Sequence, residues 1–173
     1  PLPYAELRVA SAFSFLDGAS LPADLVARAA ELGLPAIALV DRNGVSGAPR
    51  FYKAARTAGL RALVGAEVVL SELPESRLTL LVESPAGYKN LCKLLTAAAR
   101  GKVKGAAAAS WHEVAEFSAG LHVLTGGDEG PLAAALAGSG DRLARARAML
   151  ERLAHLFPGR LHVELQRHGR REE

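Results

Sequence analysis

Polar side chains follow the first predicted strand of this sequence, in a place where chemistry could be carried out. Apolar residues alternate over 5–9, then Ser11, Ser14 and Asp17 follow, and a helix begins near Ser20. This order of strand, polar loop and helix is the repeating unit of α/β barrels. In such barrels the loops at the carboxyl ends of the strands carry the functional site. The first candidate site is therefore the end of this strand.

The alternate positions at the end of the same strand are Arg8 and Ala10. Neither a guanidinium group nor a methyl group binds a metal ion, and neither transfers protons under ordinary conditions. Further along, Asp41 and Arg42 follow a nearly continuous apolar run, and Glu67 lies inside another predicted strand. If these strands form one barrel, we expect the carboxylates and the arginines to converge at one mouth.

The composition limits the class of protein. The chain has 173 residues, enough for one domain over 1–173, and 50% of them are hydrophobic while only 5% are aromatic. A core of Ala, Leu and Val suits an α/β fold. No apolar run reaches the roughly 18 residues of a membrane span, so we expect no membrane contact and a cytoplasmic location. The single cysteine, Cys92, excludes an internal disulfide.

Periodicity and turn residues divide the chain into six strands alternating with helices. After the first strand, we expect strands over 34–40, 61–70, 78–83, 121–125 and 160–166. We expect helices over 20–33, 48–58, 87–100, 110–117, from 131, and over 141–157, with a polar link over 71–76 and a loop over 101–109. Ser20 is a candidate helix cap, and Ser110 with Glu113 has the spacing of a capping box. The alternation predicts βαβ units in a parallel sheet or barrel.

Other residues that could carry chemistry have simpler interpretations. Cys92 lies among apolar helix positions and is predicted to be a core residue rather than a nucleophile. Gly126 and Gly127 lack the Lys and Ser/Thr of a phosphate loop, so a turn is expected there. The sequence spacing of His112, His122, His155 and His162 indicates no shared metal site. Lys89, Lys93, Lys102 and Lys104 form a basic surface that is solvated or, as the alternative, contacts DNA.

Four separate motifs, in order, resemble one known family. They are AELRVASAFSFLDGAS, ALVDRNGVSGAPRFYKAARTAGLRALVGAEV, GYKNLCKLLTAAARG and VELQRHG. Together they resemble the N-terminal polymerase-and-histidinol-phosphatase (PHP) domain of bacterial C-family DNA polymerases. FSFLDGAS and VELQRHG are most similar to the error-prone, damage-inducible branch. The missing initiator Met and the polar run at the end favour a fragment of a longer polymerase.

The resemblance implies a parallel (β/α)7 barrel, a distorted relative of the TIM barrel, truncated here at its C-terminal end. It also implies a cluster of metal ions at the strand ends. The family's first motif is His-x-His, and Arg8 and Ala10 stand there; its second ends Asp-His, and Asp41 and Arg42 stand there. Arg77 replaces a further family histidine. The remaining ligand positions are Asp17, Asp41, Glu67 and His168.

Each histidine-to-arginine change removes a ligand and adds a positive charge, so we expect no metal ion and no catalytic residue in this chain. Our hypothesis is that guanidinium groups replace the metal ions, forming an ion-pair network. Its candidates are Arg8, Asp17, Asp41, Arg42, Glu67 and Arg77. Gripping a phosphate with the same arginines is an alternative. His168 is either a leftover ligand or a solvated residue.

The expected function is that of a degenerate PHP domain with a structural or interaction role in an error-prone, translesion DNA polymerase, a nucleotidyltransferase of DNA repair and replication. Expected partners are the rest of that chain, the DNA template-primer, the sliding clamp and translesion accessory proteins. Mg²⁺ would serve the polymerase site of the parent. The alternative is a metal-dependent phosphoesterase or proofreading exonuclease with a remodelled site, which would use Zn²⁺ or Mn²⁺. An unrelated α/β binding protein would require four accidental motif matches.

Overall fold

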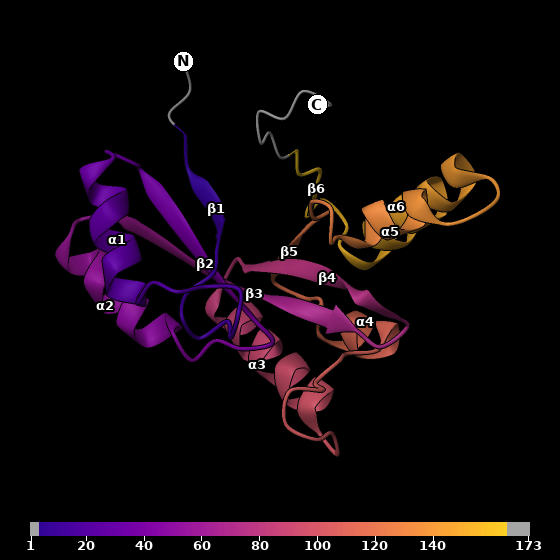
Figure 1. Ribbon diagram of the computed structural model, residues 1–173, viewed down its shortest axis with the longest axis horizontal. Coiled ribbons are helices and arrows are strands. Elements are labelled where there is room, and N and C mark those ends of the chain that lie inside the picture. The colour runs from indigo at the N-terminus through magenta and orange to yellow at the C-terminus, as the bar shows by residue number, and fades with distance from the viewer. Residues whose placement is uncertain (1–3, 166–173) are drawn as a thin grey trace.

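A single curled sheet organises the chain in the computed structural model, which describes residues 4–165. The strands are β1 (Glu6–Val9), β2 (Ala36–Arg42), β3 (Arg61–Leu70), β4 (Leu73–Val82), β5 (Leu121–Leu124) and β6 (Leu161–His162). The helices are α1 (Pro22–Glu31), α2 (Ala48–Thr57), α3 (Pro85–Ala99), α4 (Trp111–Phe117), α5 (Pro131–Ala137) and α6 (Arg142–Leu156). The strands lie in the order of the sequence, β1 to β6. The predicted α/β class and barrel-like sheet are confirmed (Figure 1).

The direction of β4 corrects the expectation of an all-parallel sheet. β1, β2 and β3 are parallel, and so are β5 and β6, but β4 runs antiparallel to both of its neighbours. The polar link expected over 71–76 is mostly strand, because β4 begins at Leu73 and forms a hairpin with β3. Its first four residues are Leu73, Pro74, Glu75 and Ser76, of which Pro74 and Glu75 are exposed, so this end lacks the apolar alternation by which a buried strand is recognised.

Helices cover the convex face of the sheet. α1 and α2 pack on the β1 and β2 side through an apolar cluster around Ile37 and Phe51, while α3, α4 and α6 enclose a larger cluster that includes Leu80 and Phe157. Both Phe51 and Phe157 are fully buried. In Figure 1, α1 and α2 lie on one side of the sheet edge, and the α5 and α6 pair projects from the other.

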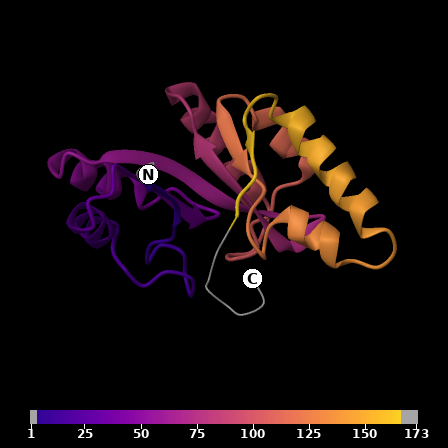
Figure 2. The ribbon, with the colours of Figure 1, turned by 90° about the horizontal axis from the view of Figure 1, so that it is seen from above.

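The concave face remains open within residues 4–165. A third, smaller cluster of Ala38, Val40, Leu81 and Leu124 lies there, with Leu63 packed against it. Figure 2 shows the curl of the sheet, with the N-terminal and C-terminal portions on opposite arms. Side chains from β1, β3, β4, β5 and the segment through β6 line a trough of about 830 Å³ there.

The helix ends test two capping predictions and show a third side-chain cap. Leu21, not Ser20, is the N-cap of α1, and no side-chain hydrogen bond caps that helix, so the Ser20 prediction is wrong. The capping box of Ser110 and Glu113 is confirmed, since the side chain of each residue accepts a hydrogen bond from the backbone N–H of the other. At α6, Asp141 accepts a bond from the Ala144 amide. Within residues 4–165, no helix is long and apolar enough to cross a membrane.

Candidate functional site

Arg8 forms the centre of the candidate site, at the end of β1. Its Nε lies 2.5 Å from Oε1 of Glu67 on β3, and its Nη1 lies 3.5 Å from Oε1 of Glu164, which follows β6. The Arg8 side chain is 19% exposed and that of Glu67 only 7%. One guanidinium group therefore bridges the first strand to the middle and to the far arm of the sheet.

Arg77 extends the same set of contacts from β4. Its Nη1 lies 3.1 Å from Oδ2 of Asp17, 3.5 Å from Oε2 of Glu67 and 3.3 Å from Oε2 of Glu129. Glu129 is held beside it because the Arg77 amide donates to the Glu129 carbonyl oxygen. Glu129 also lies 3.9 Å from Arg8. We call the set of Arg8, Asp17, Arg42, Glu67, Arg77, Glu129 and Glu164 the mouth network.

Asp17 reaches the network from the loop that follows β1. Gly18 approaches the Ser11 backbone so closely that a Cβ atom at this position would lie 2.2 Å from the Ser11 carbonyl oxygen. Only glycine permits this close approach, and the resulting compact loop aims Asp17 at Arg77. The same Oδ2 atom of Asp17 also lies 3.2 Å from Nη1 of Arg42. Arg42 also donates from Nη2 to the Phe15 carbonyl oxygen at 2.8 Å.

Asp41 requires a correction, because it makes no ion pair within residues 4–165. Its carboxylate is 1% exposed and accepts hydrogen bonds from the Ser11 amide at 2.7 Å, from Ser11 Oγ, and from Ser14 Oγ at 2.8 Å. Ser14 Oγ in turn accepts from the Arg42 amide. These neutral donors satisfy the buried charge, so Asp41 fastens the β1 loop to the end of β2 and needs no arginine.

The electrostatics of Arg8 reflect two opposed effects. Burial by itself lowers the pKa of the guanidinium group, because it disfavours the charged form. The charge of Glu67 and its hydrogen bond, followed by Glu164 and Glu129, outweigh this effect and raise the pKa of Arg8 above its ordinary value. Arg8 therefore remains a cation inside the site.

The residues at the strand ends do not fit a metal cluster. Arg8, Ala10, Asp17, Val40, Glu67 and Arg77 line a cavity of about 210 Å³ there. Two of these six side chains are guanidinium groups, which offer no lone pair and repel a cation. No group of three or more His, Cys, Asp and Glu side chains within residues 4–165 could hold a metal ion. The carboxylates of this cavity already face nitrogen cations.

The sequence alone assigned no role to two acidic residues of the site, Glu129 and Glu164, and it left the role of His168 undecided. Glu129 was assigned only to a turn, and Glu164 was quoted in the VELQRHG motif without a role. The position of Glu164 near the end of the strand expected over 160–166 was a usable signal, because strand ends carry the site. His168 lies outside the described residues, so its alternatives stay open.

The curled α/β sheet with polar residues at its strand ends has counterparts among known proteins. The model of the family described as "PHP domain" matches residues 6–168, and the chain belongs to this family. A crystal structure from Bifidobacterium adolescentis, of a protein provisionally named a metal-dependent phosphoesterase, superposes with a TM-score of 0.56 at 15% identity. The match covers 86% of this chain and 75% of that one, and it supports the fold alone.

Two curated relatives are named error-prone DNA polymerase. The protein from Symbiobacterium thermophilum is 40% identical over 95% of this chain, and the protein from Mycobacterium tuberculosis strain H37Rv is 39% identical over 96%. In both cases the matched part is only 16% of the relative's own length. The chain is thus similar to one portion of much longer polymerases.

Proposed function

We propose that this chain is the PHP part of an error-prone DNA polymerase and that its strand-end site is structural rather than catalytic. The observation that carries the proposal is the mouth network, in which the guanidinium groups of Arg8, Arg42 and Arg77 each face a carboxylate. The family resemblance implies histidine ligands at these three positions. Its ion pairs join β1, β3, β4, the β1 loop and the segments at Glu129 and Glu164. The network would hold the two arms of the sheet together.

The charge balance favours ion pairing over phosphate binding. The mouth network contains three arginines and four carboxylates. An entering phosphate would add negative charge to an already negative group and would compete with carboxylates for the same guanidinium forks. A structural role requires no ligand, because each guanidinium group already faces a carboxylate partner.

In the longer polymerase, the domain would support primer extension past damaged template while another part of the chain supplies the Mg²⁺-dependent nucleotidyl-transfer site. Its partners would be the rest of that chain and the DNA template-primer, together with the sliding clamp and translesion accessory proteins, in the cytoplasm. Residues 1–173 would then behave as one domain. The 40% identity to a protein named error-prone DNA polymerase supports this placement.

The first test asks whether the strand-end cavity binds metal or hydrolyses phosphodiesters. We would incubate the 173-residue chain and a Glu67→Gln variant with Zn²⁺ or Mn²⁺, measure retained metal by mass spectrometry, and assay phosphodiester hydrolysis. We expect no hydrolysis and no metal binding that depends on Glu67. Turnover together with metal that is lost in Glu67→Gln would instead support a phosphoesterase or proofreading exonuclease.

The second test measures the network itself by a double-mutant cycle on Arg8→Ala and Glu67→Ala. Each change removes the shortest contact of a mostly buried partner and leaves that partner only longer ones, so each should lower the free energy of unfolding by about 3 kcal/mol. Their coupling should be about 1–3 kcal/mol. The matched control is the exposed pair of Arg147 and Glu151 on α6, 2.9 Å apart, whose coupling should stay below about 0.5 kcal/mol. Equal couplings in the two cycles would contradict a structural network.

A further inference from the structure

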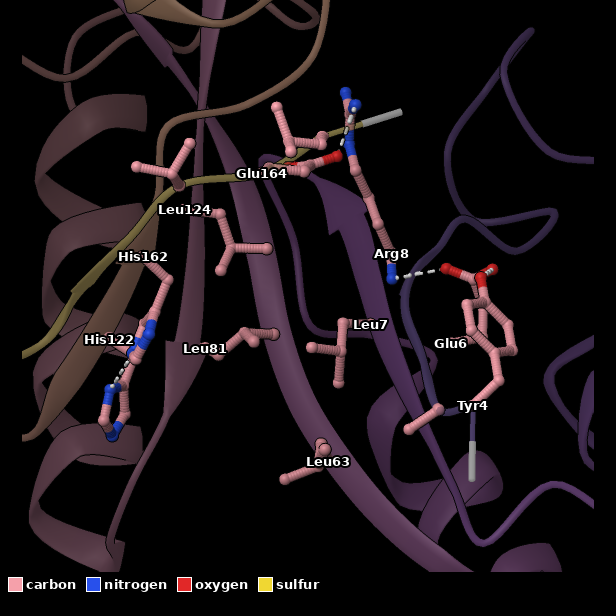
Figure 3. A pocket seen from close by; sticks show the side chains of 13 residues that line it. Tyr4, Glu6, Leu7, Arg8, Leu63, Leu81, His122, Leu124, His162 and Glu164 are labelled. Carbon is pink, nitrogen blue, oxygen red and sulfur yellow. Dashed lines mark hydrogen bonds and ion pairs between the residues drawn. The ribbon is translucent and has the colours of Figure 1, made fainter. Parts of the chain in front are cut away.

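Two histidines that are 40 residues apart in the sequence meet in the trough on the concave face of the sheet. Nδ1 of His122, on β5, lies 2.9 Å from Nε2 of His162, on β6. The ring centroids are 5.1 Å apart and the rings are tilted by 36°. Figure 3 shows both rings on the β5 and β6 side of the trough, with Arg8, Glu6 and Tyr4 on the opposite side.

The register of the strands explains why the two rings face each other. His162 pairs with Leu124 of β5, and Leu124 lies two residues after His122. Residues two apart on a strand share a face, and so do paired residues on neighbouring strands. His122, Leu124 and His162 therefore all project from the concave face, and the two imidazoles are diagonal neighbours.

A hydrogen bond joins the two facing nitrogen atoms, so one of them carries a proton in the absence of a metal ion. A shift of that ring to its other tautomer turns both lone pairs toward each other, and imidazole nitrogen is a ligand that Zn²⁺, Cu²⁺ and Ni²⁺ bind well. Zinc binds imidazole nitrogen at about 2.0–2.1 Å, and a tetrahedral angle would place the two nitrogens about 3.4 Å apart. The present 2.9 Å separation would have to increase by only about 0.5 Å, which small ring rotations can provide. His162 is exposed, and the 830 Å³ trough leaves room for water as the remaining ligands.

We propose that His122 and His162 form a two-histidine site for a borderline divalent cation such as Zn²⁺, completed by water. The site is separate from the strand-end cavity, whose lining includes neither histidine. Its effect would be to link β6 to β5. β6 is a two-residue edge strand, and within residues 4–165 β5 is its sole partner in the sheet. An ion held by one ligand from each strand would fasten this weakly attached edge.

The test is isothermal titration of the metal-free 173-residue chain with Zn²⁺, together with thermal unfolding in Zn²⁺ and in EDTA. Saturable binding with one equivalent and a higher Tm in Zn²⁺ are expected. His122→Gln and His162→Gln, each made singly, should abolish both effects. The matched control is the double variant His112→Gln and His155→Gln, which removes histidines from α4 and α6 and should bind Zn²⁺ as the unchanged chain does.

A structural effect of the substitutions can be separated from loss of a ligand, because only loss of a ligand removes the difference between Zn²⁺ and EDTA. Absence of saturable binding in the unchanged chain, or binding that survives both single variants, would overturn the site. Zinc that is lost in Glu67→Gln but kept in His122→Gln would also overturn it, and would contradict the structural role of the mouth network as well. Failure of the histidine site alone leaves the proposed function intact.

Discussion

The convex face of the sheet and the mouth of the sheet are built from the same strands but are stabilised in different ways. On β3, Ala66 and Val68 are fully buried in the larger apolar cluster, while Glu67 between them joins the mouth network. The convex face depends on shape and apolar area, so similar side chains can replace one another there. The mouth depends on ion pairs, so the loss of one charged side chain leaves its partners with fewer counter-charges and lowers the stability of the fold.

The largest loss of stability should come from a substitution on the convex face. Phe157→Ala removes a fully buried ring at the end of α6 and leaves a cavity that the surrounding helices fill only in part. We expect the free energy of unfolding to fall by about 4 kcal/mol in urea titrations. Leu143→Ala on the same helix removes a side chain that is 78% exposed and should have little effect. Similar losses for both would mean that α6 does not pack as described.

The next effect should come from the hydrogen bonds of Asp41. Asp41→Asn keeps the shape of the side chain but turns an NH₂ group toward Ser11 and Ser14, which donate to the carboxylate. Stability should fall by about 2 kcal/mol, measured by urea unfolding. Asp128→Asn, at an exposed position, is the control and should be neutral. If Asp41→Asn left the stability unchanged, the β1 loop would be held by other contacts.

A smaller effect, in this case a gain in stability, is expected from a substitution at Thr79 on β4. Its Oγ1 is buried and has no hydrogen-bond partner within residues 4–165. Thr79→Val removes the unsatisfied hydroxyl at nearly constant shape and should stabilise the chain by about 1 kcal/mol in thermal or urea unfolding. Destabilisation would indicate that the hydroxyl has a partner after all.

The smallest effect should come from the rim of the mouth network. The Arg42 side chain is 32% exposed, more than those of Arg8 and Arg77, so water screens its pairing with Asp17. Arg42→Gln should cost only about 0.5 kcal/mol, and the cost should shrink further in high salt. A salt-independent loss as large as that expected for Arg8→Ala would remove the distinction between rim and centre.

Local sequence signals predicted most elements because they depend on neighbouring residues. Asp141 bonds the Ala144 amide three residues later, and the capping box of Ser110 and Glu113 spans the same distance. The helix expected over 141–157 was located closely from its apolar periodicity and from the turn residues that follow it. The hairpin of β3 and β4 was missed because Pro74, Glu75 and Ser76 give the start of β4 no apolar alternation, and a strand of that kind is specified by its hydrogen-bonded partner rather than by its own pattern.

The sequence by itself determined that Arg8, Arg42 and Arg77 stand at positions for which the family resemblance implies histidines, and that Asp17, Asp41 and Glu67 follow or lie within predicted strands. Tertiary structure alone decided how they pair. It brought Glu129 and Glu164 into the mouth network, kept Asp41 out of it, and placed His122 against His162. The physical reason is that ion pairs and imidazole contacts act over a few ångströms in space, whereas the spacing along the chain specifies only which residues share an element.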